Sequence, residues 1–172
     1  PAWGVSETFR LLDLPDSEKP GGWKRKYQGR LDTVRIESAR YEKICKGLKV
    51  AEQAALRNRY TLDIYKQTNE LFHYPVKLLE VLEVYDSTKN DEERLQALVR
   101  IGDVCNSFKS MRAEFEKTYS QTRFMESPEG YIADQNHHHH LSALSNNSDW
   151  IFLYEMPMVE KVERWLKEQK DN

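Results

Sequence analysis

Apolar side chains recur every seven residues between positions 64 and 85, and this repeat constrains the fold more than any other feature of the sequence. Residues seven apart lie on the same side of an α-helix, so the repeat predicts one long helix with an apolar stripe. Further apolar positions widen the stripe enough to meet two neighbours in a bundle. Pro75 lies inside it and predicts a kink or a new segment. The main series is Ile64, Leu71, Leu78 and Tyr85; Thr68, Pro75 and Leu82 are interleaved with it, and Tyr65, Phe72 and Leu79 flank both.

A helix is expected on each side of this one. The first runs from Leu31 to a short break at Arg57–Asn58–Arg59, and its apolar side holds Val34, Tyr41, Leu48 and Ala55, with Leu31, Ile44, Cys45 and Ala51. The other follows a polar turn at 86–90. Asn90 or Asp91 caps its start, where Glu92 and Glu93 favour the helix dipole. It is expected to end near residues 119–123, with an inward face of Leu95, Leu98, Ile101, Cys105, Phe108, Phe115 and Tyr119.

The last helix is expected to start at Ser148 or Asp149. Its stripe is Trp150, Tyr154, Met158, Val162 and Trp165. The apolar run over 150–159 is also compatible with a buried strand, but the helical pattern from Met158 onward favours a helix that passes through Pro157 with a kink. Before it, a turn at 127–130 and a short helix over 134–144 form an unusually long connection.

The predicted fold is therefore all-α: an antiparallel four-helix-type bundle over residues 31–172, with a long histidine-containing loop or short helix before the last helix. Residues 1–30 are predicted to be irregular because prolines and glycines interrupt any period. Two interpretations of this segment remain open: a linker packed on an upstream domain, or a strap across the bundle. The chain opens without an initiator Met or a signal-like apolar segment, which predicts a fragment.

Composition agrees with long helices in a single domain and excludes some partners. The 172 residues include only seven glycines and six prolines. The net charge of −2, with both signs interspersed, gives no electrostatic reason to expect nucleic acid or an anionic membrane. No apolar run of 18 residues is present, so no membrane span is predicted. For Cys45 and Cys105 we favour buried thiols over a disulfide, which an oxidising compartment would still permit.

Four consecutive histidines, His137–His140, are the first candidate for unusual chemistry. A zinc site needs side chains that converge, whereas adjacent residues of a helix point 100° apart. At most two rings can share an ion: His137 with His140 on a helix, or His138 with His140 on an extended chain. Asp134 or Glu155 would have to complete the site. We favour rings that pack and hydrogen-bond at the mouth of the bundle, and we predict no metal or other cofactor.

Glu155 is the second candidate because it is the lone charge in the apolar run over 150–159. Buried without a partner, it would have a raised pKa and become a candidate acid or base. We favour a partner instead, such as Arg112, Arg123 or a histidine. The predicted binding or interface residues are Asp134, Asn136, His138, His140 and Glu155.

No catalytic residue is predicted. The sequence contains no Ser/His/Asp or Cys/His spacing, Gly-rich phosphate loop or CxxC. Tryptophan and tyrosine rings can stack on sugars, but the expected helical stripes favour core positions for Tyr41, Tyr65, Tyr85, Trp150 and Trp165.

The last 60 or so residues resemble the helical region at the C-terminal end of certain bacterial glycoside hydrolases, which are similar to the family 20 β-N-acetylhexosaminidases. The matching segments are Thr122–Arg123, Pro128–Glu129–Gly130–Tyr131–Ile132, Asp134–Gln135, His138, His140–Leu141, Asp149–Trp150 and Tyr154–Glu155. The earlier helices fit only in length and order.

The resemblance implies an upstream catalytic barrel in which an adjacent Asp–Glu pair guides the attack of the sugar's own acetamide. The only adjacent Asp–Glu pair in this sequence, Asp91–Glu92, is explained by helix capping, so no catalytic residue is carried over. The chain would then be an accessory domain with the upstream domain as its partner, and possible further partners are a carbohydrate or a second copy. A periplasmic, cell-surface or secreted location is implied. The alternatives are a stand-alone interaction bundle and a metal-dependent enzyme that uses the histidines.

Overall fold

The structure is a computed structural model that describes residues 13–119, 121 and 155–171, and within the last stretch the side chains of 158–169. Five helices make up most of this part of the chain, and it contains no strand. The predicted all-α class is therefore confirmed. The helices are α2 (Gly22–Lys26), α3 (Gln28–Ala54), α4 (Arg59–Asp86), α5 (Asp91–Tyr119) and α6 (Glu155–Asp171).

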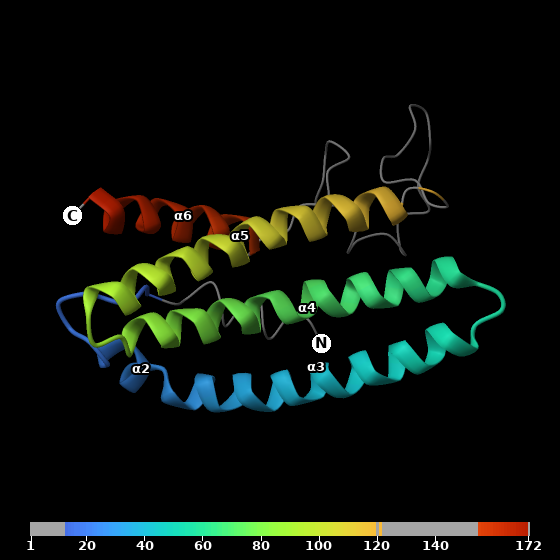
Figure 1. Ribbon diagram of the computed structural model, residues 1–172, viewed down its shortest axis with the longest axis horizontal. Coiled ribbons are helices and arrows are strands. Elements are labelled where there is room, and N and C mark those ends of the chain that lie inside the picture. Colours follow the sequence, from blue (N-terminus) through green and yellow to red (C-terminus); the bar gives the residue numbers. More distant parts are fainter. Residues whose placement is uncertain (1–12, 120, 122–154, 172) are drawn as a thin grey trace, which may run out of the picture.

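The long helices run antiparallel to their neighbours, with α4 between α3 and α5 (Figure 1). The shorter α6 lies against α5 at the end of the bundle that also holds α2. It runs antiparallel to α5, since Glu163 pairs with Lys109 whereas Leu166 lies over Gly102. Its other neighbour is α4, where the rings of Tyr85 and Trp165 meet edge to face with their centroids 4.9 Å apart.

Local chemistry explains where the helices begin and end. Asn90 caps α5, because its Oδ1 accepts the N–H of Glu93 at 2.8 Å, and Glu93 in return accepts the N–H of Lys89 at 2.9 Å. The predicted break between α3 and α4 is present although no glycine or proline enforces it. Asn58 adopts the left-handed conformation there with φ 56°, which asparagine tolerates better than most residues. Pro75 lies inside a continuous α4, so no new segment starts there.

Residues 13–27 form a strap across one end of the bundle. Trp23 is buried, and its indole N–H donates to the carbonyl of Asp13 at 2.5 Å. The backbone N–H of Gly21 donates to the carbonyl of Asp86 at the end of α4, at 2.8 Å. The prediction of an irregular segment up to residue 30 is wrong for residues 22–26 and 28–30, which are helical. Gly21 has φ +73°, which sets the turn from which α2 starts.

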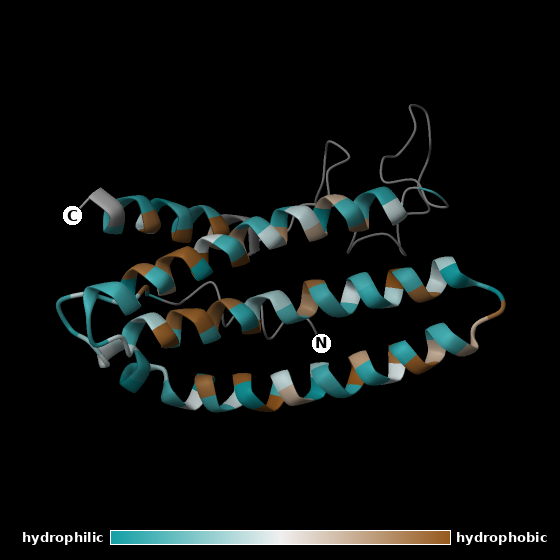
Figure 2. Cartoon of the chain, in the orientation of Figure 1, coloured by the Kyte–Doolittle hydropathy of each residue, from teal (hydrophilic) through white to brown (hydrophobic). Residues whose placement is uncertain are grey.

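The core lies at the end of the bundle that holds α2 and α6. From α3 it takes only Leu31 and Val34, and α4 contributes from His73 onward. In the described chain no side chain between positions 35 and 72 is buried. We call residues 36–72 the outer hairpin. Figure 2 shows that its apolar residues are isolated among hydrophilic ones. The buried apolar residues include Tyr74, Leu78, Leu82, Tyr85, Leu98, Ile101, Cys105, Phe108, Val159, Val162 and Trp165.

Several side chains predicted to face the core are exposed. Ile44 is 50% exposed and Tyr65 62% exposed, and Ala51 is exposed as well. The reason is that, among the described helices, α3 is covered in the outer hairpin only by α4, and α4 only by α3 and α5, so the remaining sides of both helices stay open there. Leu95, in the first turns of α5, is 58% exposed because Ala97 and Leu98 fill the contact with the neighbouring helices. The core positions of Tyr85 and Trp165 are confirmed, whereas Tyr41 is only half-buried.

Candidate functional site

The predicted site residues fall almost entirely outside the described chain. Asp134, Asn136 and His137–His140 all lie there, as do Trp150 and the predicted start of the last helix at Ser148 or Asp149. Glu155 is the first residue of α6. One of its suggested partners, Arg112, pairs with Glu116 at 2.8 Å. Chemistry in the described part therefore has to be sought elsewhere, at the contact between α3 and α4 and at the end of α4.

A polar cluster lies in the contact between α3 and α4, around His73. The imidazole is 8% exposed and lies flat on the phenol ring of Tyr41, with ring centroids 3.7 Å apart and planes 5° apart. Ser38 donates a hydrogen bond to Glu80, and its Oγ is 3.5 Å from Nε2 of His73. The hydroxyl of Tyr41 donates to Glu70. These contacts join two helices across positions up to 42 residues apart, so they fix how α3 lies on α4.

The electrostatics of the cluster keep the imidazole neutral. Burial lowers the pKa of His73 below its ordinary value of 6.5, and the ammonium of Lys77 acts in the same direction. The carboxylates of Glu80, Glu70 and Glu42 oppose this shift without reversing it. Nδ1 of His73 is buried and has no hydrogen-bond partner among the described residues. Protonation would therefore place a charge where burial disfavours it.

The hydroxyl, imidazole and carboxylate of Ser38, His73 and Glu80 do not form a catalytic triad. The Ser38 proton goes to Glu80, whereas an activated nucleophile gives its proton to the imidazole. The separation of 3.5 Å between Oγ and Nε2 also exceeds the reach expected of a general base, roughly 2.6–3.2 Å. Sequence reasoning missed this cluster. The available signal was Ser38 itself, a polar residue at helical spacing between Val34 and Tyr41.

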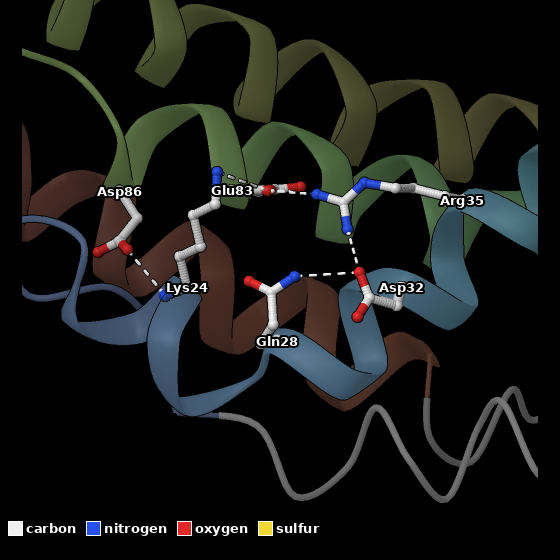
Figure 3. A network of polar contacts seen from close by, with 6 residues as sticks. All are labelled: Lys24, Gln28, Asp32, Arg35, Glu83 and Asp86. Carbon is white, nitrogen blue, oxygen red and sulfur yellow. Dashed lines mark hydrogen bonds and ion pairs between the residues drawn. The ribbon is translucent and has the colours of Figure 1, made fainter.

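A second polar network joins the strap to α3 and α4 at the end of the bundle (Figure 3). Glu83 accepts ion pairs from Lys24 at 3.0 Å and from Arg35 at 2.8 Å, and Arg35 also pairs with Asp32 at 2.7 Å. Gln28 donates to Asp32 at 3.0 Å. Because Glu83 on α4 is held from both α2 and α3, the network fixes the end of the strap to the bundle.

Asp86 ends α4 and organises the start of α2. Its carboxylate is 3% exposed, and Oδ2 accepts the backbone N–H of Lys24 at 2.8 Å. This side chain, 62 residues away in sequence, satisfies an N–H in the first turn of α2 that has no partner within the helix. Oδ1 is buried without a partner among the described residues. The arrangement is structural, since it joins two chain segments that are far apart in the sequence.

A cavity of about 400 Å³ lies beside this network, between α2, the end of α4 and the start of α5. Its volume is in the range of small-molecule sites, roughly 300–1,000 Å³. Its two carboxylates are already engaged, Glu83 with cations and Glu93 with the cap of α5. One of its two hydroxyls, that of Thr88, donates to the carbonyl of Tyr85 at 2.8 Å. It is lined by Lys24, Glu83, Val84, Ser87, Thr88, Glu93, Gln96, Ala97 and Arg100.

Within the described ranges, no three histidine, cysteine, aspartate or glutamate side chains gather closely enough to hold a metal ion. The two cysteines are free: Cys105 is buried and Cys45 is half-buried. No described helix is long and apolar enough to cross a membrane, as predicted.

Comparisons of the chain with models of protein families, with curated proteins and with solved structures found no match. The resemblance to glycoside hydrolases therefore stays a prediction.

Proposed function

We propose that this chain is an accessory, non-catalytic helical domain of a glycoside hydrolase similar to the family 20 β-N-acetylhexosaminidases. Its task is to pack against the catalytic domain of the same polypeptide. The prediction of an upstream catalytic domain comes from the segments between Thr122 and Glu155 that resemble the glycoside hydrolases. The helical architecture agrees with it, and the surface of the outer hairpin supports a role in docking.

The exposed apolar residues of the outer hairpin carry this proposal. Tyr65 and Phe72 lie seven residues apart on α4, on the same stripe as Leu79. Leu79 is 4% exposed, whereas Phe72 is 52% and Tyr65 62% exposed. This stripe of α4 is therefore buried at the end of the bundle that holds the strap and exposed to solvent in the outer hairpin. Tyrosine and phenylalanine side chains are enriched at surfaces that meet another protein.

The polar side chains buried among the described residues support the same interpretation. His73 and Asp86 are both used to join helices. Such positions stabilise a scaffold, and they do not present reactive groups to solvent. The proposal therefore assigns the chemistry to another domain.

A direct test is an assay of the isolated chain on an aryl N-acetylglucosaminide. We expect no hydrolysis above the buffer rate, and turnover that survives repurification would contradict the proposal. A stand-alone interaction bundle is the second candidate, because the exposed Tyr65 and Phe72 would serve it equally well. The two differ in what the gene encodes: a catalytic barrel joined to this chain, or a protein of about this size alone.

A further inference from the structure

One stretch of the outer hairpin has an excess of positive charge. Between positions 43 and 59 five cations stand against one carboxylate, that of Glu52. This stretch therefore has a net charge of +4 in a chain of net charge −2, which leaves −6 for all other residues. We call its cations the basic face: Lys43, Lys46, Lys49, Arg57 and Arg59.

The cations of the basic face have no close partner in the described part of the chain, although the charge of Arg59 adds to the effect of Lys66 in lowering the pKa of Glu52. All five are exposed, and none makes a hydrogen bond or an ion pair with a described residue. Glu52, the carboxylate of the stretch, is held by Lys66 at 2.8 Å. Lys24, Arg35 and Lys109, by comparison, are each paired with a carboxylate of another helix.

Exposed aliphatic side chains lie among these cations. Val50 is 66% exposed, and it follows Lys46 by four residues and Lys43 by seven, so the three share one side of α3. Leu56 is 95% exposed in the turn after α3, directly before Arg57. A protein interface usually has an apolar core and a polar rim.

We propose that the basic face belongs to the docking surface of this domain, in addition to Tyr65 and Phe72, and that it meets an acidic surface of a partner protein. The inference rests on the proposed function, in which the partner is the catalytic domain of the same polypeptide. Charge complementarity would orient the two domains, while Val50 and Leu56 supply the apolar contact. A protein surface fits better than a single-stranded nucleic acid, because bases usually stack on aromatic side chains and the stretch from 43 to 59 contains none.

Carbodiimide crosslinking of the polypeptide as the gene encodes it tests the contact. This reagent joins a lysine amine to a carboxylate only where the two touch. We expect peptides containing Lys43, Lys46 or Lys49 to be joined to aspartates or glutamates of the catalytic domain. The yield should fall several-fold between about 0.05 M and about 0.5 M salt, because the Debye length shrinks from roughly 14 Å to roughly 4 Å. Exposed Lys89 and Lys167, at the other end of the bundle, serve as internal controls.

Charge reversal provides a second readout that does not need the lysines to react. The triple variant Lys43→Glu, Lys46→Glu, Lys49→Glu should separate the domains and raise the radius of gyration measured by small-angle scattering. The matched control, Lys89→Glu, Arg164→Glu, Lys167→Glu, changes the net charge equally at exposed, unpaired positions and should leave the radius unchanged. Circular dichroism of both variants confirms that the helices persist.

The outcomes separate this inference from the proposed function. If the polypeptide is compact but other lysines crosslink and the charge reversal has no effect, the basic face is not part of the docking surface. The proposed accessory function is not contradicted by that result. An extended wild-type polypeptide without interdomain crosslinks, or a gene without a catalytic domain, overturns the proposed function and the inference with it. Crosslinks from the basic face to a second copy of this chain, or tighter binding to anionic vesicles or duplex DNA than to the catalytic domain, also overturn the inference.

Discussion

The phenol ring of Tyr41 on α3 lies parallel to the imidazole of His73 on α4, with 3.7 Å between ring centroids. Because this contact buries His73 and lowers its pKa, stability should depend on pH. The folded-state pKa lies below the unfolded value near 6.5, so the unfolded chain binds the proton more tightly. The contribution of His73 is complete above pH 6.5 and is lost as the pH falls through the folded-state pKa. Urea unfolding between pH 8 and pH 5 measures this loss.

The variant His73→Phe is the comparison for that titration. It keeps a flat ring against Tyr41 and removes the titrating group, so the unfolding free energy of the wild type should fall more steeply than that of the variant as the pH drops below 6.5. Equal pH slopes for the two proteins would show that His73 does not contribute to the dependence.

Asp86→Ala should destabilise the fold by about 1–3 kcal/mol. The substitution leaves the N–H of Lys24 without its acceptor and weakens the attachment of the strap to α4. Asp86→Asn keeps an oxygen at the same place and should cost less. Asp103→Ala, at an exposed position of α5, should stay within about 0.5 kcal/mol of wild type. Chemical denaturation of the three variants checks the order, and an equal effect at positions 86 and 103 would contradict it.

Alanine should have opposite effects at two glycines. A Cβ on Gly102 would lie 4.0 Å from Leu166, an ordinary contact, so Gly102→Ala should stabilise α5 by about 1 kcal/mol. Gly21 has φ +73°, a conformation that costs an L-residue about 1–2 kcal/mol, so Gly21→Ala should destabilise the protein. Thermal unfolding of the two variants gives the sign directly. A loss of stability at Gly102 would indicate a tighter contact between α5 and α6.

The two thiols should differ in reactivity. Burial raises the pKa of Cys105 to about 11, so it is almost wholly protonated at pH 8, where the thiolate is the reactive form. Cys45 is half-buried on α3, and Nδ2 of Asn69 contacts its sulfur at 3.4 Å. Iodoacetamide at pH 8 should therefore label Cys45 first and Cys105 only after denaturant is added. Mass spectrometry of the modified peptides distinguishes the two sites, and early labelling of Cys105 would contradict its burial.

The features that the sequence predicts correctly are local. The cap at Asn90, the break near Asn58 and the apolar stripe through Leu78 and Tyr85 depend on residues a few positions apart, and the helices follow from them. Exposure of Ile44 and Tyr65 was not predictable in this way, because a heptad pattern identifies an apolar stripe but not how many helices cover it. The cluster around His73 was not predictable either, because it depends on which residues of α3 lie opposite which residues of α4.

The absence of buried side chains between positions 35 and 72 of the described chain has a consequence for hydrogen exchange. Amides in the second half of α3 are protected only by their own helix and one partial neighbour, so they can exchange through openings that leave the core intact. Amides around Leu82 in α4 and Ile101 in α5 flank fully buried side chains and should exchange only when the whole domain unfolds. The hairpin of α3 and α4 should therefore exchange slowly near the core and fast in the outer hairpin. Docking on a partner should slow amide exchange in the outer hairpin alone.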